Sequence, residues 1–87
     1  MRFTTSDVAA ATGGEVFGRD TEVEGASIAS RLIHPGELFV PIVAARDGHD
    51  FIGTANEGGA GAYLTSGPIE SGTAIRVADT ARALSDL

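Results

Sequence analysis

The sequence predicts an α/β domain with a small mixed sheet of about five short strands and helices packed on it. Apolar segments at 37–43 and 62–65 are separated by a helix-like pattern at 47–58, which is typical of a βαβ crossover. A further helical pattern, at 4–14, comes before the first strand-like segments. Because the chain has 87 residues, we expect a single domain over 1–87.

The first element is a short helix within residues 4–14, TTSDVAAATGG. Thr5 or Ser6 can cap its N-terminus, and the alanines that follow favour helix. Gly13 and Gly14 are typical of a helix end.

Three strand-like segments come next. Residues 15–17 can form a short strand, and 22–28 alternates apolar and polar residues, as in a strand with one solvated face. Residues 37–43 are more continuously apolar, as in a strand covered on both faces. Since Pro41 cannot donate a backbone hydrogen bond, we expect strand pairing to weaken there.

The second half of the chain predicts two helices and two strands. A helix over 47–58 can be capped by Asp47 or His49, and its Phe51, Ile52 and Ala55 have the spacing of one buried face. Strands are expected at 62–65 and 74–77. Asp79 is placed to cap a last helix over 80–87.

The charged residues exclude several functions. The chain has twelve acidic residues and six basic ones, giving a net charge of −6, and every basic residue is arginine. A chain without a basic surface is not expected to bind nucleic acid. Without lysine it has no Gly-Lys-Ser/Thr phosphate loop and no Schiff-base chemistry.

The sequence also limits the cellular compartment and the kinds of partner that we expect for this chain. No apolar run approaches the roughly 18 residues that cross a membrane, and the N-terminus lacks the pattern of a signal peptide. Cysteine is absent, which removes disulfides and thiolate metal sites. We therefore expect a cytoplasmic chain without a membrane partner, a metal site or a cofactor of its own.

Ser30 and Arg31 are the first candidate binding residues, because they come directly after the strand predicted at 22–28. Loops that follow strand ends are where α/β sheets bind small molecules. The alternative is a serine that caps a turn beside a surface arginine. His34 precedes Pro35-Gly36, which has the form of a type II turn, and is typical of a solvated turn residue.

His49, with acidic residues on both sides, suggests either helix capping or metal binding. A metal hydrolase that uses His34, Asp47 and His49 is poorly supported, because a metal site needs three or four ligands at suitable spacing. A Ser-His-Asp catalytic set is also poorly supported, since no G-x-S-x-G motif is present. We find no catalytic residue in the chain.

Several motifs occur in an order that resembles the N-terminal domain of the Mur ligases, which build the peptidoglycan precursor. These motifs are Ser30-Arg31, the segment PGELFV at 35–40 and the segment DGHDF at 47–51. A pattern of small and apolar residues follows at Ala55, Gly59, Ala60, Ala62 and Leu64. The chain is most similar to the family branch that adds D-alanyl-D-alanine, with the branch that adds the third peptide residue close behind.

The resemblance implies a substrate-binding domain for the uridine nucleotide of UDP-MurNAc-peptide. Ser30, with Arg31 beside it, matches the serine that contacts the uridine, and Ile28 lies at a backbone position near it. Ala44, Ala45 and Arg46 match a stretch beside the nucleotide. Ala29 and Ala44 stand where the family usually has Asp and Gly. The alternative is therefore a structural or interaction domain that keeps the fold without the ligand.

The resemblance also implies that the activity needs more than these residues. Mur ligases bind ATP and Mg²⁺ in a central domain and have a C-terminal domain, neither of which we find in this sequence. We therefore expect the parent protein to be an ATP-dependent amide ligase in cell-wall biosynthesis. The 87-residue chain is not expected to be active alone.

Overall fold

The computed structural model describes residues 2–42, 48–69 and 71–86. Its main sheet has five strands in the order β2-β7-β6-β5-β4. The outer strand β2 is antiparallel to β7, and the other neighbouring pairs are parallel. This confirms the predicted small mixed sheet. The strands are β2 (Glu15–Phe17), β4 (Ala26–Ser27), β5 (Leu38–Phe39), β6 (Ala62–Thr65) and β7 (Ala74–Arg76).

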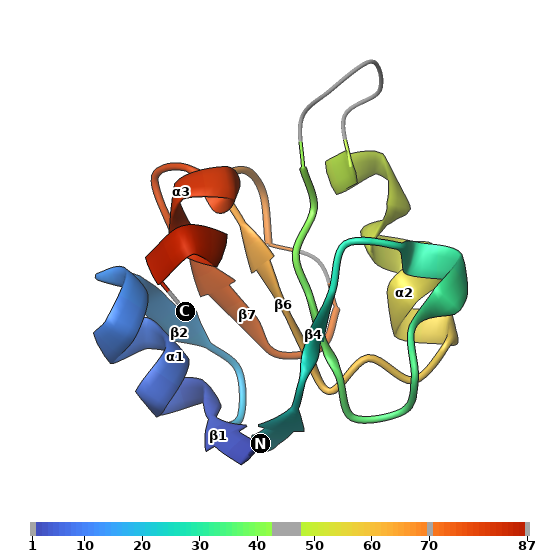
Figure 1. Ribbon diagram of the computed structural model, residues 1–87, viewed down its shortest axis with the longest axis horizontal. Coiled ribbons are helices and arrows are strands. Elements are labelled where there is room, and N and C mark those ends of the chain that lie inside the picture. The colour runs from blue at the N-terminus through green and yellow to red at the C-terminus, as the bar shows by residue number, and fades with distance from the viewer. Residues whose placement is uncertain (1, 43–47, 70, 87) are drawn as a thin grey trace.

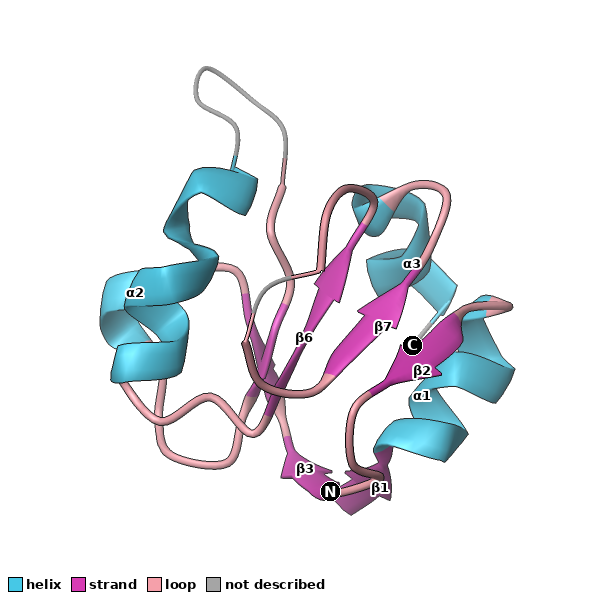
Figure 2. Ribbon diagram, turned by 180° about the vertical axis from the view of Figure 1, so that it is seen from behind, coloured by secondary structure: helices cyan, strands magenta, loops and turns pink. Residues whose placement is uncertain are grey.

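Helices cover both faces of the main sheet (Figure 1). Helices α1 (Thr5–Thr12) and α3 (Thr80–Asp86) lie together on one face, and α2 (Ile52–Glu57) lies on the other. The view from behind shows the same three layers (Figure 2). None of the helices in the described residues is long and apolar enough to cross a membrane.

The alternation of side chains along each strand divides the core into two clusters. Leu38, Val40 and Leu64 belong to the cluster that includes Val8 of α1 and Ala83 of α3. The second cluster contains Phe39 and Tyr63, together with Ile52 and Ala55 of α2. Because successive strand residues point to opposite faces, the parallel strands supply apolar residues to both layers.

The N-terminal strand and helix differ from the sequence prediction. Residues 2–4 form a strand, β1 (Arg2–Thr4). The N-cap of α1 is Thr4 rather than Thr5 or Ser6: its hydroxyl accepts the Asp7 N–H at 3.1 Å, and the Asp7 carboxylate accepts the Thr4 N–H at 3.0 Å. This is a capping box. The helix ends at Gly13, in the left-handed conformation with φ 70°, as the sequence predicted.

The strand predicted over 22–28 is two strands in two sheets. Strand β3 (Glu22–Glu24) pairs with β1 in a separate two-stranded antiparallel sheet, and β4 pairs with β5. Gly25 lies between them with φ 77°, a conformation that glycine adopts without steric cost. The single predicted strand was wrong because this backbone turn redirects the chain from one sheet to the other.

The strand predicted over 37–43 is also shorter in the structure. Strand β5 ends at Phe39, although Val40 and Pro41 remain buried. The early end agrees with the effect expected of Pro41. The last residue of the predicted segment lies outside the described residues.

The helix predicted over 47–58 begins as a 3-10 turn. Residues Gly48–Phe51 form this turn, η2, and α2 follows and ends before Gly58. His49 lies inside η2, and the N-cap residue of α2 is Phe51, which makes no side-chain cap hydrogen bond, so the prediction that His49 caps the helix was wrong. Asp47, the other predicted cap, lies outside the described residues. Ile52 and Ala55 are buried as predicted, and Phe51 packs half-buried against their cluster.

The C-terminal elements follow the sequence prediction closely. Strand β6 has the predicted bounds, and β7 ends one residue before the prediction. The Asp79 carboxylate accepts the Arg82 N–H at 3.1 Å, as expected of a residue that caps α3.

Candidate functional site

The loop between β4 and β5 contains the candidate binding residues. Strand β4 ends at Ser27, and a 3-10 turn, η1, spans Ser30–Leu32. Ser30 and Arg31 therefore lie in the loop after a strand of the parallel part of the sheet, where the sequence predicted a binding position. Ser30 is half-buried and Arg31 is exposed.

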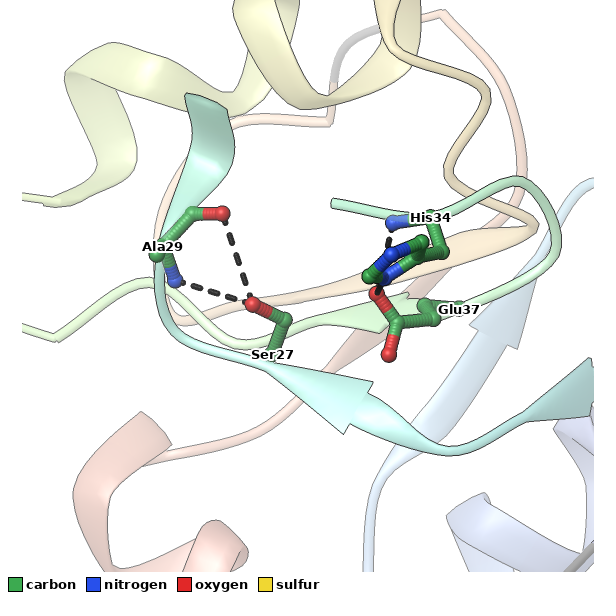
Figure 3. A network of polar contacts seen from close by, with 4 residues as sticks. All are labelled: Ser27, Ala29, His34 and Glu37. Carbon is green, nitrogen blue, oxygen red and sulfur yellow. Dashed lines mark hydrogen bonds and ion pairs between the residues drawn. The ribbon is translucent and has the colours of Figure 1, made fainter. Parts of the chain in front are cut away.

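Ser27 fixes the start of this loop (Figure 3). Its hydroxyl accepts the backbone N–H of Ala29 at 3.1 Å and donates to the Ala29 carbonyl at 3.4 Å. Serine side chains commonly close turns by such local bonds. The contact sets the direction in which the chain leaves β4, and therefore where Ser30 lies.

A turn at His34–Glu37 fixes the other end of the loop. The Glu37 N–H donates to the His34 carbonyl at 3.1 Å, and Gly36 has φ 87°. These values confirm the predicted type II turn. The Glu37 carboxylate also accepts the His34 N–H at 2.6 Å and lies 3.4 Å from its Nδ1 (Figure 3). The His34 side chain is 82% exposed, in agreement with its prediction as a solvated turn residue.

The middle of the loop packs on α2. Ile33 joins the apolar cluster of Phe39 and Ile52. A Cβ at Gly58 would lie 2.5 Å from Ile33 Cγ2, so the close approach of the loop to this end of α2 requires glycine. The Gly36 N–H donates to the Gly59 carbonyl at 2.8 Å. These contacts hold η1 against the helix.

A cavity of about 510 Å³ opens where η1 meets the beginning of α2. Two of its apolar side chains are unusually exposed, Ile28 at 59% and Leu32 at 73%. Among the described residues, the lining consists of Ile28, Ala29, Ser30, Arg31, Leu32 and Phe51. These residues combine apolar walls with one hydroxyl and one guanidinium.

This lining suits an organic anion better than a metal ion. None of its described residues is acidic, whereas hard cations bind carboxylate and carbonyl oxygens. An apolar wall can pack against a ring, a hydroxyl can donate to or accept from a polar edge, and a guanidinium can pair with phosphate. The arrangement provides binding groups, and no nucleophile paired with a base occurs among the residues of this lining.

The structure brings together three of the six predicted site residues. Ile28, Ser30 and Arg31 line one cavity. The other three, Ala44, Ala45 and Arg46, lie outside the described residues, so their place beside this cavity stays a prediction.

Sequence reasoning missed Leu32 and Phe51 as lining residues. Phe51 was assigned only to the core, although its position in the DGHDF motif was a signal. For Leu32, the signal was an apolar residue directly after Ser30-Arg31.

The two histidines do not form a common site. The turn of His34 bonds to Gly59 after the C-terminal end of α2, whereas His49 precedes the N-terminal end. The described residues include no group of three or more His, Cys, Asp and Glu that could hold a metal ion, and Asp47 lies outside them. The structure therefore gives the metal hydrolase alternative no support.

His49 does contact a serine, Ser66, directly after β6. Its Nε2 accepts the Ser66 backbone N–H at 3.0 Å and lies 3.1 Å from the Ser66 hydroxyl oxygen. A histidine that activates a serine needs the Nε2 lone pair for the hydroxyl proton. Here the backbone N–H shares that lone pair, so the contact has the character of a structural tie rather than a nucleophile with its base.

Comparison with known proteins gives sequence matches to two ligases, whereas no family model matches the chain. The UDP-N-acetylmuramoyl-tripeptide–D-alanyl-D-alanine ligase of Escherichia coli K12 is 38% identical over 68 residues, 77% of this chain. The UDP-N-acetylmuramoyl-L-alanyl-D-glutamate–2,6-diaminopimelate ligase of Syntrophomonas wolfei is 39% identical over 69 residues, 75% of this chain. The matches span only 15% and 14% of those two proteins.

Solved structures match over the whole chain. The UDP-N-acetylmuramoylalanyl-D-glutamyl-2,6-diaminopimelate–D-alanyl-D-alanyl ligase of Acinetobacter baumannii superposes with a TM-score of 0.89 and 25% identity, over 100% of this chain and 21% of that one. A crystal structure of MurF from the same organism gives a TM-score of 0.90 at 25% identity, covering 20% of its chain. Sequence and fold therefore point to the same group of proteins.

Proposed function

We propose that this chain, which has the fold and the motifs of a Mur ligase N-terminal domain of the MurF type, binds the uridine nucleotide of a UDP-MurNAc-peptide. One observation carries the proposal. Residues of two separate motifs, Ser30-Arg31 and the DGHDF segment that contains Phe51, line one cavity of about 510 Å³. A cavity of this volume is in the range of small-molecule sites.

The lining residues offer a contact for each part of a uridine nucleotide. The apolar side chains of Ile28, Leu32 and Phe51 can pack against the uracil and the ribose. The Ser30 hydroxyl can bond a polar edge of these rings, together with the backbone of 44–46. Arg31 can pair with the diphosphate. Recognition of a polar edge is specific because an unpaired buried donor or acceptor is costly.

The proposed biological setting is peptidoglycan precursor synthesis, in which the chain would be the substrate-binding part of an ATP-dependent amide ligase. Since no residue of this chain is lysine, ATP and Mg²⁺ would be bound by other domains of such a ligase. We expect the 87-residue chain to show neither ATPase nor ligase activity.

A titration with UDP followed by NMR tests the proposal. We expect weak binding, on the order of millimolar, because no partner domain encloses the ligand. Shifts should cluster at 28–31 and 44–47. Ser30→Ala should weaken binding several-fold, since one hydrogen bond contributes about 0.5–1.5 kcal/mol, and it should leave the fold intact. The turn variant His34→Gln is a matched control that should bind UDP like the wild type.

A structural or interaction domain remains the second candidate function. Ile28 and Leu32 line the cavity and expose apolar surface, which could face another protein segment. Ala29 also provides no carboxylate to orient Arg31. If saturating UDP caused no shifts, or only shifts at the His34 turn, nucleotide binding would be wrong and this second function would be favoured.

A further inference from the structure

The cavity wall formed by Phe51 is tied to the sheet by the histidine two positions before it. His49 and Phe51 lie in the same 3-10 turn, η2, and the ring of His49 reaches the first residue after the central strand β6. Phe51, the N-cap residue of α2, makes no side-chain cap hydrogen bond. The contact with Ser66 therefore joins this end of the α2 layer to the sheet.

The direction of the hydrogen bond sets the protonation state of the ring. A backbone N–H can only donate, so Nε2 must supply a lone pair to Ser66 at 3.0 Å. In a neutral imidazole, the proton then lies on Nδ1. Protonation of Nε2 would leave the Ser66 N–H facing another donor, although the Ser66 hydroxyl, at 3.1 Å, could then accept from the ring.

Two of the described acidic residues belong to this region. Asp50 is next to His49 in η2, and Asp79 lines a cavity of about 280 Å³ together with Ser66. Both are acceptors when ionised. Neither carboxylate can donate to Nε2 of the neutral ring as the Ser66 N–H does, although an ionised carboxylate could accept from a protonated ring.

We propose that His49, neutral and protonated on Nδ1, is a positioning residue that holds η2 on the end of β6 and thereby sets the Phe51 wall of the binding cavity. Its effect on the ligand rests on the proposed uridine-nucleotide function. The effect on Phe51 does not, and it can be measured without ligand. Protonation or removal of the ring should move Phe51 and weaken UDP binding.

Two substitutions distinguish the effect of the hydrogen bond to Ser66 from the effect of the imidazole ring itself. In His49→Gln, the side-chain carbonyl oxygen can accept the Ser66 N–H but does not titrate. In His49→Leu, the acceptor is lost and a side chain of similar bulk remains. His34→Gln makes the same change as the first variant at an exposed turn residue and serves as the control.

The first measurement is NMR of the 87-residue chain without ligand, at pH 8. We expect the ring nitrogens of His49 to report the Nδ1–H tautomer. In His49→Leu, the Ser66 amide and the Phe51 ring resonances should shift together away from their wild-type positions. In His49→Gln and in His34→Gln they should stay close to the wild type.

The second measurement is UDP affinity at pH 8. We expect His49→Leu to bind about two- to tenfold more weakly than the wild type, the range of one hydrogen bond, and His49→Gln to bind nearly as well as the wild type. An Nε2–H tautomer, Phe51 resonances that do not change in His49→Leu, or undiminished binding by His49→Leu would overturn the proposal. If UDP does not bind the wild type while the Phe51 resonances change in His49→Leu, the contact between His49 and Ser66 stands and the nucleotide function is wrong.

Discussion

Helices α1 and α2 begin in different ways. The start of α1 is fixed by nearby residues, through the reciprocal bonds of Thr4 and Asp7. Asp20 adds to this start by accepting the Thr5 hydroxyl at 2.5 Å and the Ser6 N–H at 3.1 Å. The N-cap residue of α2, Phe51, makes no side-chain cap hydrogen bond, and the helix begins from a 3-10 turn that contacts the sheet through His49. The helix beside the candidate cavity therefore depends on contacts between elements.

The largest effect on stability is expected from a substitution that disrupts the packing beneath α2. Phe39 is 1% exposed and belongs to the cluster of Ile52 and Ala55. Phe39→Ala should lower the free energy of unfolding by about 3–5 kcal/mol, as is typical of a buried phenylalanine. Denaturant unfolding measures the loss, which a domain of this size has little stability to absorb.

Phe51→Ala makes the same truncation as Phe39→Ala, but at the edge of the same apolar cluster. Because Phe51 is only half-buried, its truncation should cost less than that of Phe39. It should also reduce UDP binding, whereas a stable Phe39 variant keeps the cavity lining. Equal costs for the two variants would contradict the burial difference described here.

An intermediate effect is expected at the start of α1. Thr4→Ala removes the hydroxyl that accepts the Asp7 N–H and should cost about 0.5–2 kcal/mol. Thr4→Ser keeps an acceptor and should recover most of this loss. Hydrogen exchange should show the loss at α1 and leave η2 and the cavity unchanged. A similar loss of protection at η2 would mean that the two helix starts are not independent.

The smallest effect concerns the pH dependence of α1. Hydrogen bonds from Thr5 and Ser6 lower the pKa of Asp20 below its usual value, which is about 3.9 in an unfolded chain. The folded state therefore favours the ionised carboxylate. This stabilisation is complete above the unfolded pKa and is lost as the pH falls through the lower folded pKa.

Asp20→Asn keeps the shape of the side chain but cannot titrate. The difference in unfolding free energy between wild type and variant should be constant near neutral pH and shrink below about pH 4. Measurements of unfolding between pH 7 and pH 2 test this. A difference that grows on acidification would contradict the sign of the pKa shift.

Features that depend on neighbouring residues were predictable from the sequence. The end of α1 at Gly13, the turn from His34 to Glu37 and the Asp79 cap each involve groups within a few positions. Their hydrogen bonds and backbone angles follow from residue type. Thr4 was predictable in the same way, since Asp7 three positions later is the signal of a capping box, but the adjacent Thr5 and Ser6 concealed it.

The break at Gly25 was not predictable from the alternating pattern. Alternation over 22–28 indicates which side chains are apolar, but it does not say which strand will pair with each half. Strand β3 pairs with β1, and β4 pairs with β5. The positive φ of Gly25 can be explained only when the pairing partners of both β3 and β4 are known.

The residues of the candidate site also fall into those that sequence motifs indicated and those that only the packing of the elements brought to the cavity. Motifs in the sequence selected Ser30 and Arg31, and the resemblance they carry predicted a uridine site. Phe51 and Leu32 became cavity residues only because η1 packs against α2 and leaves Leu32 exposed. His49 contacts Ser66, seventeen positions away, after β6 has been placed in the sheet. Local hydrogen bonding thus determined the capping box and the end of α1 and the turn at His34–Glu37, whereas the Asp20 contacts with α1 and the cavity were decided by contacts between segments distant in the chain.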